Sequence, residues 1–371
     1  MGKKRAGLLA LAGSIMAFHV GSGFASGQEI LQFYTAFGPI GGGCMCVLAA
    51  VLLTLFSAIV METGRRCRGR SLRESYVILA GKAVGTAFYA VTPLFMALVL
   101  CVTVAGGGAA LRELFGVSVG WGRLWISLPV LITVLLGLKW ITALSGSLGP
   151  VIILCAFSLG GFGILQGRAT SLWALLPHTC SSWVLAAVSY ACFGTVTQIP
   201  FLLTVGAELK SRRETHFVAF TGNCGYMLTG FVLHLGLCRS LPDVLGEPLP
   251  TLILARRLSS LCGWFYGMIL LFSIYTTAVP MLWSVCRSIA PQEHSALYRC
   301  AAVLLTAIAC VGSCLPFERL LGLLYPYIGY ASAVFFAVIL LRRGFSKKCC
   351  GFCSESLAKS GAGEYSISCC Q

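Results

Sequence analysis

The stretch "HVGSGFASGQEILQFY" occupies residues 19–34, inside an apolar segment long enough to cross a bilayer. It contains three glycines and two serines, together with glutamine and glutamate. Unpaired backbone groups are not tolerated against lipid, but they are tolerated where they line a protein-enclosed cavity. Glycine leaves helical geometry at low cost. This stretch therefore predicts that the first membrane span is broken and that the break faces an internal binding site.

The composition of the chain is that of a multi-pass membrane protein. Hydrophobic residues make up 57% of the 371 residues, charged residues 11%, and the mean hydropathy is +0.87. Soluble domains carry roughly 25% charged residues, and a spanning helix needs about 20 apolar residues. We therefore expect an all-α protein with about ten spans: 7–36, 39–62, 84–110, 121–141, 147–166, 182–206, 215–238, 260–286, 298–316 and 320–341.

The net charge of +15 reflects topology and does not indicate a nucleic-acid partner. With the N-terminus inside, 20 of the 27 lysines and arginines fall on the cytoplasmic side of these spans. Cytoplasmic loops collect such residues, so both termini are expected in the cytoplasm. The basic start lacks a small-residue cleavage site after a short apolar core, so we expect the N-terminus to be retained.

A second interruption lies in the sixth span, in "SYACFGTVTQIPFLL", which contains Pro200. Two interrupted helices at corresponding places in two halves are typical of an inverted-repeat transporter. We expect one transmembrane domain (1–343), with repeat A at about 7–166 and repeat B at about 182–341, and a disordered Cys/Ser-rich cytoplasmic tail (344–371). The alternative is that the small residues serve helix packing, since Gly23 and Gly27 have the GxxxG spacing.

The candidate solute-binding residues are the small and polar residues of the two interruptions and one threonine of the third span. Pro200 marks the downstream edge of the second break, because it removes a backbone donor. The candidates are Gly21, Ser22, Gly23, Ala25, Ser26, Gly27, Thr103, Gly194, Thr195, Thr197 and Gln198.

"GSGFASGQEILQFY", with "YTTAVP" at 275–280, resembles the YkvI-type bacterial membrane proteins. That family is similar to a distant branch of the amino acid–polyamine–organocation superfamily, whose fold is typified by LeuT. The resemblance implies a 5+5 inverted repeat in the bacterial cytoplasmic membrane and secondary transport by alternating access. It further implies that helices 1 and 6 line the solute site and that helices 3 and 8 complete it.

The eighth span carries a candidate ion site. Ser273 shares a helical face with Thr276 and Thr277, three and four residues later. Together with carbonyls freed near Gly21 and Ser22, these hydroxyls would form the all-oxygen shell that hard cations prefer. The resemblance implies Na⁺ at this place. The alternative is that the hydroxyls bond back to the preceding helical turn.

Glu29 is the one acidic residue expected inside a span, where an unpaired charge costs at least about 2.5–3.5 kcal/mol. It is a candidate gate, structural anchor or proton carrier, and a gating or structural role is favoured because no second membrane acid is available as a relay. His19, just before the break, is a further proton candidate because its charge changes near neutral pH. A hydrogen-bonded core histidine is the alternative.

The sequence contains neither a phosphate-binding loop nor catalytic metal-ligand spacing. No enzyme activity, metal or cofactor is therefore expected. The expected partners are a small polar or zwitterionic solute, such as an amino acid, and the lipid bilayer. The expected function is cation-coupled transport of that solute, driven by Na⁺ or H⁺; the alternative is a non-transporting sensor or assembly partner with the same fold. Solute identity, transport direction and oligomeric state stay open.

Overall fold

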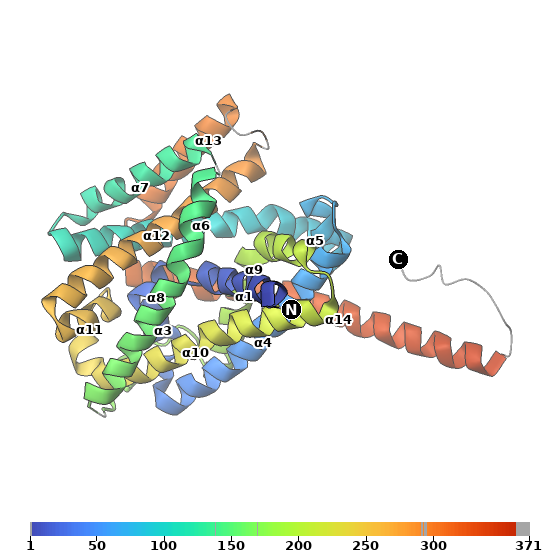
Figure 1. Ribbon diagram of the computed structural model, residues 1–371, viewed down its shortest axis with the longest axis horizontal. Coiled ribbons are helices and arrows are strands. Elements are labelled where there is room, and N and C mark those ends of the chain that lie inside the picture. Colours follow the sequence, from blue (N-terminus) through green and yellow to red (C-terminus); the bar gives the residue numbers. More distant parts are fainter. Residues whose placement is uncertain (1, 138, 169, 291, 293–294, 361–371) are drawn as a thin grey trace.

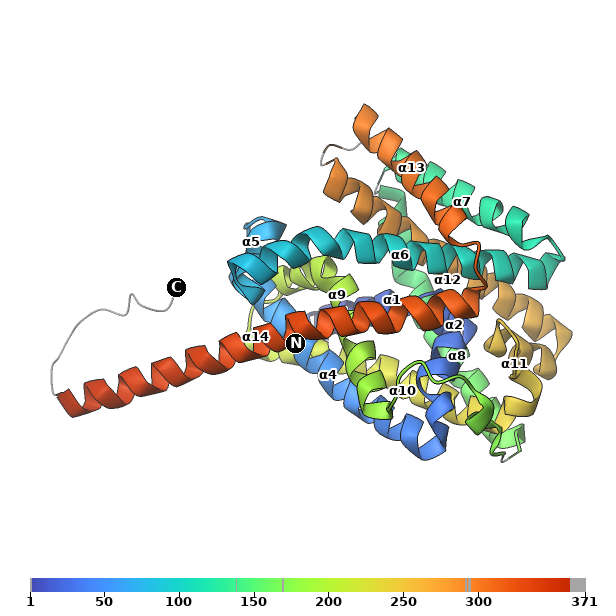
Figure 2. The same ribbon diagram turned by 180° about the vertical axis from the view of Figure 1, so that it is seen from behind.

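The computed structural model describes residues 2–137, 139–168, 170–290, 292 and 295–360. The described chain is helical, without β-strands, and it forms one bundle (Figures 1 and 2). The first half comprises α1 (Gly2–His19), α2 (Ser22–Ser26), α3 (Gln28–Phe33), α4 (Gly38–Arg66), α5 (Leu72–Ala80), α6 (Lys82–Phe115), α7 (Val119–Leu136) and α8 (Lys139–Gln166), with a short 3-10 turn at Thr35–Phe37.

The second half follows a connection that contains the 3-10 turn Leu172–Leu175. It comprises α9 (Trp183–Glu208), α10 (Arg212–Val244), α11 (Pro250–Leu258), α12 (Ser260–Ile289), α13 (Ala296–Gly312) and α14 (Phe317–Ser360). Six helical segments of the described chain are long and apolar enough to cross a membrane, and three shorter helices are also apolar. The prediction of an all-α membrane protein is confirmed.

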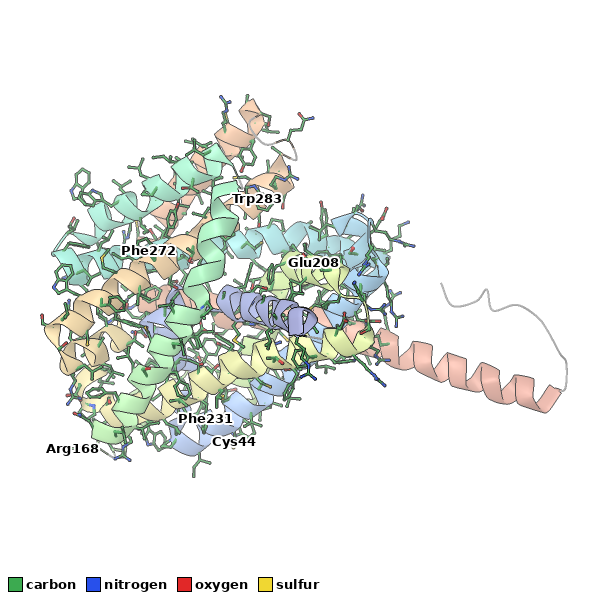
Figure 3. The ribbon with its side chains drawn as sticks, viewed as in Figure 1. Cys44, Arg168, Glu208, Phe231, Phe272 and Trp283 are labelled. Atoms are coloured by element: carbon green, nitrogen blue, oxygen red, sulfur yellow. The ribbon has the colours of Figure 1, made fainter. Side chains whose placement is uncertain are left out.

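Large apolar side chains are exposed on the surface of the bundle. Figure 3 shows the described side chains, with Phe272 of α12 labelled. Phe272, Phe220 of α10 and Trp125 of α7 are all exposed. Water-soluble proteins rarely expose large contiguous apolar patches, whereas a surface that contacts lipid tails requires them. The outside of the helices therefore suits the hydrocarbon core of a bilayer.

The two halves repeat one order of elements. In each half a short helix of nine residues, α5 or α11, stands between the second and the third long segment. The two short helices lie at opposite ends of the bundle (Figure 1). This placement is what an inverted repeat produces. We use "the α5 end" and "the α11 end" for the two ends of the molecule.

The first predicted span is broken, as expected. The helix α1 ends at His19, α2 begins at Ser22, and a second break follows at Gly27, whose φ of +81° favours glycine. Three short helical pieces therefore replace one continuous span. Figure 2 shows this segment at the centre of the bundle, between the long helices.

The predicted break of the sixth span is wrong, because α9 is one continuous helix from Trp183 to Glu208. A proline inside a helix removes a single backbone donor, so Pro200 does not by itself require the chain to unwind. The hydroxyls of Thr195 and Thr197 bond back to the carbonyls of Ala191 and Phe193. These two threonine hydroxyls are therefore satisfied within an intact helix.

Two further boundaries differ from expectation. The predicted span 121–141 crosses Gly137, whose φ of +99° ends α7. The expected disorder from residue 344 is wrong for 344–360, because α14 continues to Ser360. No proline follows Pro326 in the chain, so no residue of that kind interrupts the helix. Residues 361–371 lie outside the described residues.

Close helix packing holds the centre of the bundle together. The helices α4 and α9 share an extensive contact, which depends on a reciprocal pair of glycines. A Cβ at Gly64 would lie 2.2 Å from the carbonyl oxygen of Leu203, and a Cβ at Gly206 would lie 2.1 Å from that of Met61. Small residues permit such backbone approach in membrane proteins.

Candidate functional site

Both breaks of the first span turn backbone carbonyls toward side chains of other helices. The carbonyl of Val20 lies 3.5 Å from the Ser273 hydroxyl and 3.4 Å from the Thr277 hydroxyl. The carbonyl of Ala25 accepts hydrogen bonds from Thr251 at 2.7 Å and from Tyr266 at 2.5 Å. Protein groups thus replace the helical partners that the breaks remove, as the membrane interior requires.

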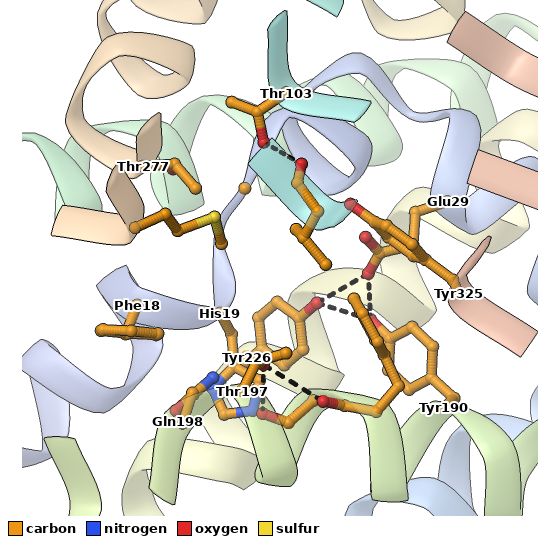
Figure 4. A pocket seen from close by; sticks show the side chains of 15 residues that line it. Phe18, His19, Glu29, Thr103, Tyr190, Thr197, Gln198, Tyr226, Thr277 and Tyr325 are labelled. Carbon is orange, nitrogen blue, oxygen red and sulfur yellow. Dashed lines mark hydrogen bonds between the residues drawn. The ribbon is translucent and has the colours of Figure 1, made fainter. Parts of the chain in front are cut away.

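A small cavity of about 40 Å³ lies beside the first break. Figure 4 shows its lining side chains, which come from α1, α3, α6, α9, α10, α12 and α14. The volume is close to that of one or two water molecules, so an amino acid would require the lining to move apart. The lining residues are Phe18, His19, Gly21, Glu29, Val99, Thr103, Tyr190, Phe193, Gly194, Thr197, Gln198, Tyr226, Thr277, Met281 and Tyr325.

Glu29 is the acidic residue of this lining, and it is 5% exposed. The hydroxyl of Tyr190 lies within hydrogen-bond distance of its Oε1, and the hydroxyl of Tyr226 lies 3.1 Å from the same atom. The two hydroxyls are themselves 2.5 Å apart, so the three oxygens form a closed triangle (Figure 4). In the described part of the chain, no lysine or arginine forms an ion pair with Glu29.

Two buried acceptor atoms of the cavity lining have no hydrogen-bond partner: His19 Nε2 and Gln198 Oε1. The other ring nitrogen of His19, Nδ1, lies 3.0 Å from the carbonyl of Ile15 and must donate to it. In the neutral ring Nε2 is consequently an acceptor. A buried polar group without a partner costs about 1–3 kcal/mol, so both acceptors are open to a hydrogen bond from a water molecule or a ligand in the cavity.

The candidate ion site is partly assembled. Ser273 and Thr277 lie on the face of α12 toward the first break, and both hydroxyls approach the same Val20 carbonyl. The Thr277 hydroxyl also bonds back to the carbonyl of Ser273 at 2.9 Å. Thr276 does not join them, because its hydroxyl contacts only the carbonyls of Phe272 and Ser273 in its own helix. The freed carbonyl belongs to Val20, whereas the sequence analysis named Gly21 and Ser22.

The cavity lining includes several of the predicted solute residues: Gly21, Thr103, Gly194, Thr197 and Gln198. Others of the first span lie behind it. Ser26 bonds locally to Gly23 and Gln28, and Gly27 packs on Thr251. The predicted residues outside the lining are Ser22, Gly23, Ala25, Ser26, Gly27 and Thr195.

The tyrosines of the site were not among the residues predicted from the sequence. Tyr190, Tyr226 and Tyr325 come from α9, α10 and α14 and meet only in the folded chain. One signal was available in the sequence. Tyr190 precedes Gly194 by four residues and Gln198 by eight, so all three share one face of a helix.

The α11 end of the site is closed. Residues 22–36 are all buried. Gln28 donates to the carbonyl of Glu247 at 2.6 Å, and Gln32 donates to that of Glu318 at 2.9 Å. In α1, by contrast, most residues from Arg5 to His19 are exposed or half-buried. The first span is therefore enclosed more completely from Ser22 onward than over α1.

The described residues contain no cluster of three or more His, Cys, Asp or Glu side chains that could hold a metal ion. No family model matches the chain. The chain is 27% identical over 334 residues to the "uncharacterized membrane protein YkvI" of Bacillus subtilis (strain 168), covering 87% of this chain and 92% of that protein. It is 22% identical over 340 residues to "uncharacterized protein YyaD" of the same organism, covering 92% and 97%.

Two solved structures share the fold. MhsT in complex with L-phenylalanine superimposes with a TM-score of 0.61 at 18% identity, covering 96% of this chain and 92% of that one. A mutant of the Eremococcus coleocola manganese transporter superimposes with a TM-score of 0.59 at 17% identity, covering 90% and 77%. At these identities the likeness establishes a shared LeuT-type fold and does not extend to a substrate.

Proposed function

Because this chain is a homologue of the YkvI-type membrane proteins and has the LeuT fold, we propose that it is a secondary active transporter. It moves a small polar or zwitterionic solute across the membrane by alternating access. The observation that carries this proposal is the cavity beside the broken first span. Buried polar groups line it, and two acceptors of the lining, His19 Nε2 and Gln198 Oε1, have no hydrogen-bond partner.

The difference in covering between the two ends of the first span supports alternating access. The α11 end is sealed by Gln28 and Gln32, while α1 is less covered toward the α5 end. The excess of lysine and arginine in the segments at the α5 end supports a cytoplasmic location for that end and for both termini. In this arrangement the solute leaves the cavity toward the cytoplasm and enters it from the other side after the glutamine contacts release.

Transport of the solute is coupled to the movement of a cation. The Val20 carbonyl with the Ser273 and Thr277 hydroxyls offers oxygen ligands to Na⁺, and Glu29 offers a carboxyl to H⁺. Neither enzyme activity nor a cofactor is part of this function, and the partners are the solute and the surrounding lipid.

Counterflow in proteoliposomes tests the proposal. Vesicles containing the purified protein are loaded with an unlabelled mixture of the twenty standard amino acids and diluted into a trace of the same mixture in labelled form. A carrier accumulates label transiently above the level of protein-free vesicles. A sensor or assembly partner that binds solute without moving it gives a flat trace, and a flat trace across both Na⁺ and pH gradients would contradict transport of amino acids.

A further inference from the structure

The triangle formed by Glu29, Tyr190 and Tyr226 has one hydrogen too few if the carboxyl is ionised. Three oxygen–oxygen contacts close the triangle, and a cyclic set of hydrogen bonds places one hydrogen in each of the three contacts. The two tyrosine hydroxyls supply two hydrogens. A proton on Glu29 Oε1 supplies the third, because each oxygen then donates once and accepts once around the ring. The closed triangle is thus the arrangement of a protonated carboxyl.

Every titratable side chain that faces Glu29 is a weak acid or an imidazole. Tyr190 comes from α9, Tyr226 from α10 and Tyr325 from α14, and Tyr34 follows α3. His19 comes from α1, and its ring centroid lies 4.7 Å from that of Tyr226. Among the residues that the structure describes, neither lysine nor arginine lines the cavity. No fixed positive charge of the lining is therefore available to neutralise an ionised Glu29.

The unsatisfied atoms of the same cavity are acceptors. Glu29 Oε2 lies against Gly23, where a Cβ would be 2.7 Å away, and it has no hydrogen-bond partner among the described residues. His19 Nε2 and Gln198 Oε1 are also without partners. A ligand that matches these three atoms brings hydrogen-bond donors. An ammonium group carries three donors and no acceptor.

The aromatic lining favours an organic ammonium over a metal ion. Tyr190, Tyr226, Tyr325, Phe18 and Phe193 surround the cavity, and aromatic faces attract ammonium groups at close range. Hard metal ions prefer a full oxygen shell. The oxygen atoms that come nearest to such a shell are the Ser273 and Thr277 hydroxyls beside the Val20 carbonyl, on another side of the cavity. Figure 4 shows Thr277 and Glu29 on opposite sides of the space.

We propose that Glu29 is the binding site for the ammonium group of the transported solute, and that it holds a proton until that group arrives. The proposal rests on the proposed transport function and names its substrate class, a small primary amine or amino acid. On binding, the Glu29 O–H bond breaks and the proton leaves to solvent. The carboxylate then pairs with the R–NH₃⁺ group, so the total charge of protein, solute and released proton is unchanged.

The proton on Glu29 is tested without any solute. Infrared spectra of the purified full-length protein in nanodiscs are recorded from mildly acidic to mildly alkaline pH. A carbonyl band of a protonated carboxyl is expected at neutral pH in the wild type, absent in Glu29→Gln and retained in Glu208→Gln, a matched change of an exposed carboxyl. Tyr226→Phe keeps the carboxyl and opens the triangle, so it should shift the band. Absence of a neutral-pH band that Glu29→Gln removes would overturn the proposal.

The exchange of the Glu29 proton for an ammonium group is tested with two matched sets of probes. The first set is phenylalanine, phenethylamine and N-acetylphenylalanine, and the second is leucine, isopentylamine and N-acetylleucine. In weakly buffered solution the probes with a free ammonium group should release a proton on binding, and the acetylated probes should not. Glu29→Gln should lower amine affinity by about 30-fold or more, as loss of a buried charge partner does, while Glu208→Gln leaves it unchanged.

An equal response to the acetylated probes, or proton release by NaCl alone, would overturn the ammonium assignment. Failure of every amine to release a proton would overturn it as well. These readouts are separate from transport. A protein that binds amines with proton release but gives no counterflow would contradict the transporter function and leave the site assignment standing.

Discussion

The hydroxyl of Thr277 in α12 lies 3.4 Å from the carbonyl oxygen of Val20, the residue that follows the end of α1. Ser273, one helical turn earlier, places its hydroxyl 3.5 Å from the same carbonyl. Two hydroxyls and one freed carbonyl thus converge from helices that are more than 250 residues apart in the chain. Convergence of oxygen atoms on a broken helix is the geometry from which a cation site is built.

Thr277→Val should abolish stabilisation of the protein by Na⁺. Valine has nearly the size of threonine but lacks the oxygen ligand, so packing is retained while ion binding is lost. At about ten times its Kd, a bound ion adds about 1.4 kcal/mol of stability, and the wild type should show a corresponding rise in Tm in NaCl over choline chloride. Thr276→Val is the matched control, because the Thr276 hydroxyl bonds only within α12. An Na⁺ effect that survives in Thr277→Val would place the ion elsewhere.

Gly206→Ala should destabilise the bundle although alanine is the better helix former. A Cβ at this position would lie 2.1 Å from the carbonyl oxygen of Met61, and backbone cannot yield as a flexible side chain does. Overpacking of this kind costs about 1–3 kcal/mol. Gly161→Ala in α8 is the control: its added Cβ meets nothing within 4 Å, so a gain of about 0.5–1 kcal/mol is expected. Unfolding in mixed detergent compares the two, and equal effects would contradict the close α4–α9 contact.

Gly23→Ala should disturb the carboxyl of the cavity without breaking the span. The new Cβ would lie 2.7 Å from Glu29 Oε2 and 2.9 Å from Leu321 Cδ1, so the carboxylate must shift away from Tyr190 and Tyr226. Counterflow of the labelled amino-acid mixture should fall at least tenfold, a loss of about 1.4 kcal/mol. In Gly13→Ala, where the added Cβ meets nothing within 4 Å, counterflow should equal that of the wild type. Comparable activity of both variants would remove Glu29 from the solute path.

The sequence was sufficient to predict the broken first span, because glycine and polar residues at that density have a local physical meaning. It was not sufficient for α9, where the same kinds of residue stand in a continuous helix. The difference is that Thr195 and Thr197 satisfy themselves within their own helix, whereas Val20 and Ala25 find partners in α11 and α12. The composition of a segment does not show which residues of other helices will satisfy its polar groups.

The hydrogen-bond partners of Glu29 could not be predicted from the sequence either. The residue was identified as an outlier from its position inside a span, but its partners Tyr190 and Tyr226 lie 161 and 197 residues further along the chain. Tertiary packing alone brings them together. The preference for a gating or structural role followed from the lack of a second acid, and the sequence offered no means of recognising hydroxyls as the partners.

Gln32→Leu should loosen the closure at the α11 end. The side-chain amide of Gln32 donates to the carbonyl of Glu318 at 2.9 Å and to Gln28 Oε1 at 3.2 Å, and leucine keeps the approximate volume without either bond. Loss of two buried hydrogen bonds of about 1 kcal/mol each should increase the open population by about tenfold or more.

Cys180 reports this opening, because it is 4% exposed and follows Thr179, whose hydroxyl donates to the Gln32 carbonyl at 3.2 Å. Its maleimide alkylation rate in nanodiscs, followed by mass spectrometry of the Cys180 peptide, should rise by the same factor in Gln32→Leu. The exposed Cys262 provides an internal reference, and Gln166→Leu, at the exposed end of α8, provides a matched variant. If Cys180 reacts no faster in Gln32→Leu than in Gln166→Leu, the glutamine contacts do not control access, because a gate held shut by those two hydrogen bonds cannot lose them and stay equally closed.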